Sequence, residues 1–285
     1  MLRSINQITY AHEFQMGNMR VKQPLPSQDL EQVSPFILLH HAGPDQYKPG
    51  EYKNRLGPHP HRGFEPVTFI FNGKMHHRDS MGNEGFLQAG DVQWMTAGSG
   101  VIHSEGPSEK FSEEGGTIEI IQLWINLPSK HKMTSPKYQD IPSSIIPEFF
   151  EDENKIHIKL VAGEFKNING PASTFTNITA MMVDFEKDAN FNFPVPSNQN
   201  ALIYLLEGRL KLEKSEIVKL SMIEFKNDGE EIQFQSLEKG KLLFLAGEPI
   251  NEPMVNYGPF VMNYPEEIKQ AILDYEQGKM GSLDF

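Results

Sequence analysis

The chain has 285 residues, of which 10% are aromatic and 22% charged, with a formal net charge of −12 and no cysteine. This length predicts two domains, and the lack of cysteine excludes disulfides, thiolate metal sites and cysteine nucleophiles. The acidic balance, without a run of Lys or Arg, argues against direct binding to nucleic acid.

The first half of the sequence shows short apolar runs between turn residues, the pattern of an all-β fold. The β-branched and aromatic stretch 67–71 is followed by Asn72-Gly73, a strong local signal for a hairpin, with 74–78 as the expected return strand. The run 117–125 is apolar on both faces, which predicts a strand inside a closed or sandwiched sheet.

The second half repeats this pattern after an irregular, proline-containing segment. We therefore predict an N-terminal domain at residues 1–130, a linker at 131–150 and a C-terminal domain at 151–285. The segments 69–73 and 204–208 are expected to be equivalent hairpins in two copies of one fold, as a weak internal repeat.

The end of the chain departs from the strand pattern. A helix is expected near 265–277, because Ile268, Ile272 and Tyr275 follow helical spacing. Pro265 suits its first turn, so we predict one short amphipathic helix packed by its isoleucine face.

Two segments concentrate residues that bind metals. His59 and His61 stand at positions i and i+2, and so do His103 and Glu105. Alternate residues of an extended chain share a face, so each pair can point to one side of its strand. If the two segments pair, three imidazoles and one carboxylate converge, a set that suits Fe(II), Mn(II), Ni(II), Cu(II) or Zn(II).

The other histidines are given less weight. His76 and His77 follow the expected turn and are predicted to lie on a solvated face rather than to bind a metal. His40 and His41 end an apolar run; they could line a pocket, but a structural role is slightly favoured. Three isolated histidines are expected at the surface: His12, His131 and His157.

The segments 58–65 and 93–105 resemble the two motifs of the pirin family, a bicupin family of the cupin superfamily. A further similarity covers 245–263 and the terminal helix, so the resemblance spans nearly the whole chain. It implies an all-β fold of two cupin barrels of the jelly-roll type packed together, with a short C-terminal α-helix.

The resemblance also implies a metal site. By motif position it assigns the ligands His59, His61, His103 and Glu105, holding one non-haem Fe(II) in the N-terminal barrel, with Mn, Ni, Cu and Zn as alternatives. Glu65 occupies the place of a carboxylate ligand in the wider cupin pattern, and we expect it beside the ligands rather than among them. No histidine follows His157, so the second barrel cannot repeat a three-imidazole site.

Two functions follow from the resemblance. The first is a dioxygenase of the quercetin 2,3-dioxygenase type, acting with O₂ on a flavonol-like small aromatic substrate, with Glu105 as general base. The alternative is a non-catalytic, iron-dependent regulator that binds a protein partner, such as a transcription factor or a metabolic enzyme. No apolar stretch has the length of a signal peptide or a membrane span, so we expect a cytoplasmic protein without a membrane partner.

Overall fold

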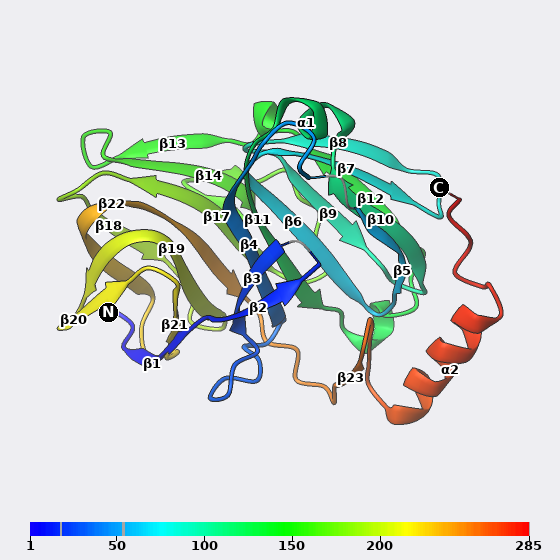
Figure 1. Cartoon of the computed structure of the whole chain (residues 1–285). Helices are drawn as coiled ribbons and strands as arrows, with labels where there is room; N and C mark the ends of the chain where they lie inside the picture. The colour runs from blue at the N-terminus through cyan, green and yellow to red at the C-terminus, as the bar shows by residue number, and fades with distance from the viewer. Residues whose placement is uncertain (18, 53–54, 285) are drawn as a thin grey trace. The chain divides into compact units, whose positions relative to one another are not determined.

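The structure is a computed structural model in which residues 1–17, 19–52 and 55–284 are described (Figure 1). Antiparallel strands dominate this part of the chain, and its α-helices are α1 (Glu109–Glu114) and α2 (Pro265–Glu276). The all-β class and the short C-terminal helix expected from the sequence are confirmed. None of the described helices is long and apolar enough to cross a membrane.

Contacts divide the chain into two compact units. The unit that we term the N-terminal unit contains Glu13–Val21, Leu38–Ser143 and Ile250–Phe285. The C-terminal unit contains Met1–His12, Lys22–Ile37 and Ser144–Pro249. The expected domains 1–130 and 151–285 are continuous segments. In the structure, by contrast, the first residues of the chain belong to the C-terminal unit and the last residues to the N-terminal unit.

Backbone hydrogen bonds account for the exchange of the chain ends. In the C-terminal unit, β1 (Ile5–Tyr10) pairs antiparallel with β21 (Ser221–Phe225). In the N-terminal unit, the nitrogen of Arg62 donates to the oxygen of Pro259 at 3.3 Å, and the nitrogen of Val261 donates to the oxygen of Arg62 at 3.0 Å. The C-terminal segment therefore lies directly beside the segment that carries His59 and His61.

Two sheets surround the candidate site. One has seven strands in the order β12-β9-β6-β11-β4-β3-β2, and the other has four in the order β5-β10-β7-β8. The strands of the first are β2 (His12–Met16), β3 (Met19–Leu25), β4 (Phe36–Tyr47), β6 (Phe64–Asn72), β9 (Val92–Thr96), β11 (Gly116–Asn126) and β12 (Lys137–Ile141). The strands of the second are β5 (Leu56–His61), β7 (Lys74–Asp79), β8 (Glu84–Gln88) and β10 (Val101–Pro107).

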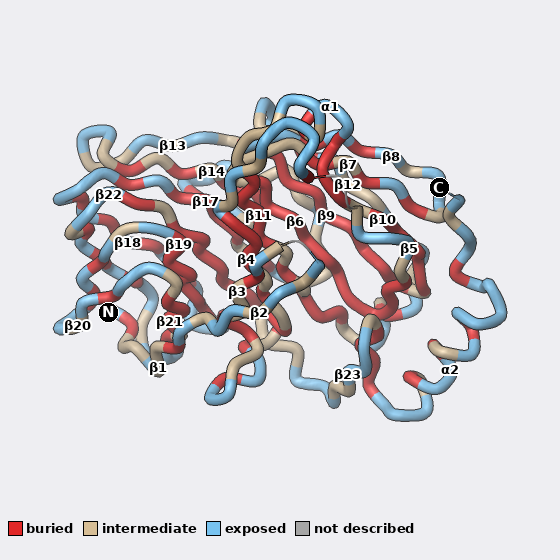
Figure 2. The backbone as a smooth tube through the Cα atoms, viewed as in Figure 1, coloured by how far each residue is buried: buried red, intermediate tan, exposed pale blue. Residues whose placement is uncertain are grey.

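The C-terminal unit is built on a nine-stranded sheet. Besides β1 and β21 it contains β13 (Glu148–Glu151), β14 (Ile156–Ala162), β17 (Ile178–Phe185), β18 (Asn190–Pro194), β19 (Asn200–Leu212), β20 (Ser215–Val218) and β22 (Glu231–Gly247). Its interior is filled by apolar side chains, and the rings of Phe193 and Phe244 stack at 4.1 Å. Buried residues follow the strands of both units in Figure 2.

The remaining described elements are short. Two small ladders pair β15 (Glu164–Phe165) with β16 (Ile168–Asn169) and β23 (Val255–Tyr257) with β24 (Phe260–Met262). The 3-10 turns are η1 (Ser129–His131) and η2 (Ser143–Ile145).

Both expected hairpins are wrong. Asn72-Gly73 does end β6, and 74–78 is extended as β7, but β6 pairs with β9 and β11 whereas β7 pairs with β8 and β10. The turn therefore carries the chain from one sheet to the other. At 204–208 there is no turn: β19 continues through Gly208, whose φ of 89° accompanies irregularities in the pairing with β22. Positive φ thus produced a bulged strand rather than a reversal.

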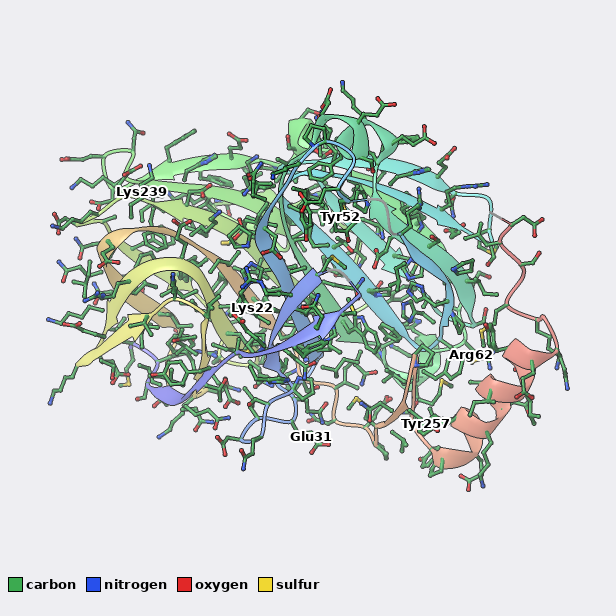
Figure 3. The ribbon with its side chains drawn as sticks, viewed as in Figure 1. Lys22, Glu31, Tyr52, Arg62, Lys239 and Tyr257 are labelled. Atoms are coloured by element: carbon green, nitrogen blue, oxygen red, sulfur yellow. The ribbon has the colours of Figure 1, made fainter. Side chains whose placement is uncertain are left out.

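The terminal helix packs by its isoleucine face, as expected: Ile268 is buried, and Ile272 packs against the same apolar cluster. Ala271 and Asp274 are buried as well, whereas Tyr275 is 38% exposed. The carboxylate of Glu267 accepts hydrogen bonds from the backbone nitrogens of Asn263 and Tyr264 and so caps the N-terminus. On this side of the helix, the carboxylate of Asp274 accepts a 2.9 Å bond from Arg62, which is 4% exposed and labelled in Figure 3.

Candidate metal centre

Three histidines converge where β5 pairs with β10. The two strands are antiparallel, with His59 directly opposite His103, and alternation places His61 on the same side as His59. The ring centroids lie 4.3 to 4.9 Å apart, and one nitrogen of each ring lies within 4.8 Å of those of the other two. We call His59, His61 and His103 the histidine triad.

β5 can carry two prolines because it lies at the edge of the four-stranded sheet. Pro58 and Pro60 have no N–H group for a second neighbour, which an edge strand does not need. Their fixed φ angles also limit the freedom of the histidines between and after them. The sequence therefore places a conformationally restricted segment with two histidines at the edge of this sheet.

The hydrogen bonding of the triad leaves nitrogens open to a metal. Among the described residues, both ring nitrogens of His61 and Nε2 of His103 are buried without a hydrogen-bond partner. Orphaned buried polar atoms are costly, and coordination would relieve that cost. Nδ1 of His59 lies 2.8 Å from the oxygen of Gly57; as the donor there, it leaves Nε2 as the free nitrogen.

Burial also sets the protonation of His61 and His103. It lowers the pKa of His61 to about 3, and the nearby His59 ring adds to this effect. The pKa of His103 is likewise held well below its usual value, first by burial and then by the neighbouring imidazoles. Both rings are therefore neutral near pH 7, which is the form that ligates metals.

Glu105 lies beside the triad, and its carboxylate is hydrogen-bonded to Gln122. A register shift separates it from His103 on β10, and its Oε1 accepts a 2.6 Å hydrogen bond from Nε2 of Gln122. Within 4.8 Å it groups with His77 and His103 rather than with His59 and His61. The structure therefore brings the three expected imidazoles together and places the expected carboxylate next to one of them.

A largely apolar cavity of about 260 Å³ opens at the triad. Its wall includes His59, His61 and Glu105 together with Tyr52, which is labelled in Figure 3. The apolar part of the lining comes from the side chains of Met16, Met19, Val21, Ala42, Leu56, Met75, Ile120 and Trp124. Apolar walls with a few convergent polar groups are typical of small-molecule sites.

His77 is the residue that the sequence interpretation missed. It was expected on a solvated face, but its side chain is fully buried, its ring stacks on Tyr138 at 4.8 Å, and its Nδ1 lies 3.4 Å from Nδ1 of His103. The signal was the alternation of β7, in which Met75, His77 and Asp79 are buried. His76 points the other way and contacts Glu84 and Phe86 near the surface.

The remaining polar candidates fall into separate places. The buried Glu65 accepts a 2.8 Å bond from Oγ1 of Thr96 and belongs to neither candidate ligand group. Nε2 of His41 lies 3.4 Å from Glu119 in the interior, which fits a structural role. His40 lines the cavity, the alternative role given for it, and its ring also packs edge-on against Phe14 at 5.5 Å.

The isolated histidines fall largely outside the core. His12 is exposed, and His131 and His157 are partly exposed, which agrees with their expected surface position.

Comparison with known proteins identifies the family. Residues 18–125 match the family model described as Pirin, and residues 180–281 match the Pirin C-terminal cupin domain. Pirin-like protein 2 of Arabidopsis thaliana is 42% identical over 275 residues, covering 92% of this chain and 80% of that protein. A Pseudomonas aeruginosa protein provisionally named as a quercetin 2,3-dioxygenase is 37% identical over 249 residues, covering 87% of each chain.

A solved structure agrees with this relationship. The crystal structure of quercetin 2,3-dioxygenase from Acinetobacter baumannii is 38% identical, covers 100% of both chains and superposes with a TM-score of 0.94. A nickel(II) complex of a bacterial pirin from Escherichia coli is 17% identical with a TM-score of 0.67 and shares the fold. With both family models and the full-length relatives in agreement, the chain belongs to the pirin family.

Proposed function

We propose that this protein is a metal-dependent dioxygenase that acts on flavonols such as quercetin, with Fe(II) as its metal. The observation that carries the proposal is the histidine triad, which has unpartnered nitrogens and of which His59 and His61 line an apolar cavity of about 260 Å³. Relatives named as quercetin 2,3-dioxygenases support the substrate class.

The donor set fits a divalent transition metal. His59, His61 and His103 would supply three neutral nitrogens, and Glu105 an anionic oxygen. Such a set suits Fe(II) and also Mn(II), Ni(II), Cu(II) or Zn(II). The ion would act as a Lewis acid that lowers the pKa of a coordinated substrate hydroxyl.

Glu105 is the proposed proton acceptor, a role in which its carboxylate would have to be released from the ion. Gln122 holds its carboxylate by the 2.6 Å bond, and the Gln122 amide is itself oriented because its Oε1 accepts a 3.3 Å bond from Nε1 of Trp124. This fixes a carboxylate oxygen at the cavity wall, as the proposed acceptor for the proton of a hydroxyl placed at the triad.

The rest of the cavity selects a flat aromatic molecule. Met16, Met19 and Trp124 provide apolar surface for a ring system. Burial raises the pKa of Tyr52, so its phenol stays protonated and can donate a hydrogen bond to a substrate oxygen.

The test is an oxygen-uptake assay on the whole chain. Protein loaded with Fe(II) without oxygen is mixed with quercetin and then with O₂. We expect loss of the flavonol absorbance with matched oxygen uptake, and we expect His59→Ala to abolish both. His157→Ala is the matched control, since His157 lies in the C-terminal unit and contacts Glu148.

A protein that binds iron tightly but neither consumes oxygen nor changes quercetin would contradict the enzymatic proposal. That result would instead favour a metal-dependent regulator with a protein partner. A protein that binds no transition metal would contradict both.

A further inference from the structure

A row of buried side chains continues from the histidine triad into the four-stranded sheet. β10 lies between β5 and β7, with His103 opposite Asp79 and Glu105 opposite His77. Nδ1 of His77 lies 3.4 Å from Nδ1 of His103, and Nε2 of His77 lies 3.6 Å from Oδ2 of Asp79. The side chains of His77, Asp79 and His103 are all buried.

The far end of the row is rigidly held. Oδ1 of Asp79 accepts hydrogen bonds from the backbone nitrogens of Met81 and Asn83, at 2.9 and 3.0 Å. Oδ2 accepts a 2.8 Å bond from Nδ2 of Asn83. The turn after β7 thus fixes the direction of the carboxylate, and the ring of Tyr138 stacked on His77 fixes the plane of that imidazole.

Metal binding would assign every proton in this row. If His103 ligates the ion through its unpartnered Nε2, its Nδ1 carries the proton and donates to Nδ1 of His77. His77 then carries its own proton on Nε2, which faces the carboxylate of Asp79. The 3.6 Å separation is longer than a hydrogen bond and would have to shorten by a few tenths of an ångström on loading.

We propose that His77 and Asp79 are positioning residues that fix the tautomer and ring orientation of His103 and strengthen it as a ligand. The inference rests on the proposed metal site. An imidazole ligand generally donates its second N–H to a carboxylate, a carbonyl or another acceptor, and loss of that acceptor weakens metal binding. Here the acceptor is a second imidazole, which is oriented in turn by a carboxylate.

The alternative is that His77 binds the ion directly, since His77, His103 and Glu105 also form a compact group. One observation favours the positioning role. Nδ1 of His77 faces Nδ1 of His103, whereas the nitrogen of His103 that is left unpartnered is Nε2.

The test measures metal binding rather than turnover. Co(II) affinity and the visible d–d spectrum are recorded for the full chain and for His77→Phe, which keeps a ring against Tyr138 but removes the acceptor. We expect affinity to fall about 10–100-fold, with an altered spectrum. His77→Asn should recover most of the affinity, because its Oδ1 stands near the position of Nδ1 and accepts the same proton.

His76→Phe is the matched control on the same strand and should bind Co(II) like the wild type. Asp79→Asn keeps the side-chain shape and should lose several-fold in affinity; it serves as a second variant if His77→Phe does not fold. The melting temperatures of the metal-free proteins separate a ligand effect from a purely structural one.

Wild-type affinity and spectrum in His77→Phe would overturn the inference and leave the metal site intact. Equal losses in His77→Phe and His77→Asn, matched by equal losses of metal-free melting temperature, would overturn it in favour of a structural role. Binding abolished by His77→Asn but unaffected by His59→Ala would assign the ion to the other group. Failure of the wild type to bind Co(II) would instead reject the proposed function itself.

Discussion

Nε2 of Gln122 donates a hydrogen bond of 2.6 Å to Oε1 of Glu105, joining the central strand β11 to the strand that carries His103. Oε1 of Gln122 accepts a hydrogen bond from Trp124, and this bond fixes the orientation of the Gln122 amide. The amide therefore presents its N–H group, rather than its oxygen, to Glu105. The bond therefore fixes the position of the carboxylate at the cavity wall.

Glu105→Gln should separate metal binding from turnover. The amide keeps the size of the side chain but cannot accept a substrate proton, so we expect turnover of quercetin to fall about 10²–10⁴-fold. The three imidazoles remain, so iron content measured by atomic absorption should stay above half of the wild-type value. Full activity in this variant would reject Glu105 as the base.

His61→Leu should show how much stability the metal-free protein loses by burying an imidazole without hydrogen-bond partners. Both ring nitrogens of His61 are buried without a partner among the described residues. An apolar side chain removes that cost, so the metal-free protein should gain about 1 kcal/mol in free energy of unfolding by urea denaturation. The increase in melting temperature caused by Ni(II) should shrink at the same time.

His157→Leu, in the C-terminal unit, serves as the control and should leave the response to Ni(II) unchanged. A metal-free His61→Leu protein much less stable than the wild type would show that the ring is held by packing instead.

Glu65 predicts a pH dependence of stability. Burial raises the pKa of Glu65 from 4.5 to about 7, opposed by hydrogen bonds such as that from Thr96. The native state thus binds a proton that the unfolded state has released between these values, and the contribution is complete below pH 4.5 and lost above pH 7. The free energy of unfolding of the metal-free wild type should therefore fall from pH 5 to pH 8 by about 2–3 kcal/mol relative to Glu65→Gln.

The control for this comparison is Glu113→Gln, which changes an exposed carboxylate. It should follow the wild-type curve. Parallel pH curves for the wild type and Glu65→Gln would mean that Glu65 ionises alike in both states.

Asp274→Ala should destabilise the N-terminal unit through its C-terminal helix. Arg62 is 4% exposed and its guanidinium donates to Asp274 at 2.9 Å, so removal of the carboxylate leaves a buried charge without its anionic partner. We expect a loss of about 2–4 kcal/mol, measured by urea denaturation of the metal-free protein. Glu276→Ala, on the exposed side of the same helix, should change stability by less than about 0.5 kcal/mol.

The sequence by itself was sufficient for the local features of the site. The i, i+2 spacing of His59 and His61 placed both rings on one face of their strand. Strand β11 and helix α2 also follow from local periodicity. These features depend on backbone geometry over a few residues, which the side-chain pattern reports directly.

Only the tertiary structure decided which segments meet. Asn72-Gly73 indicated a turn correctly but not the partner strand, because turn geometry does not specify the sheet that the next strand joins. The burial of His77 could have been inferred from its alternation with Met75, but its contact with His103 could not.

The pairing of Arg62 with Asp274, 212 positions away, likewise has no local signal. Such contacts arise when separate strands and helices bury their apolar faces together, so the complete fold determines them.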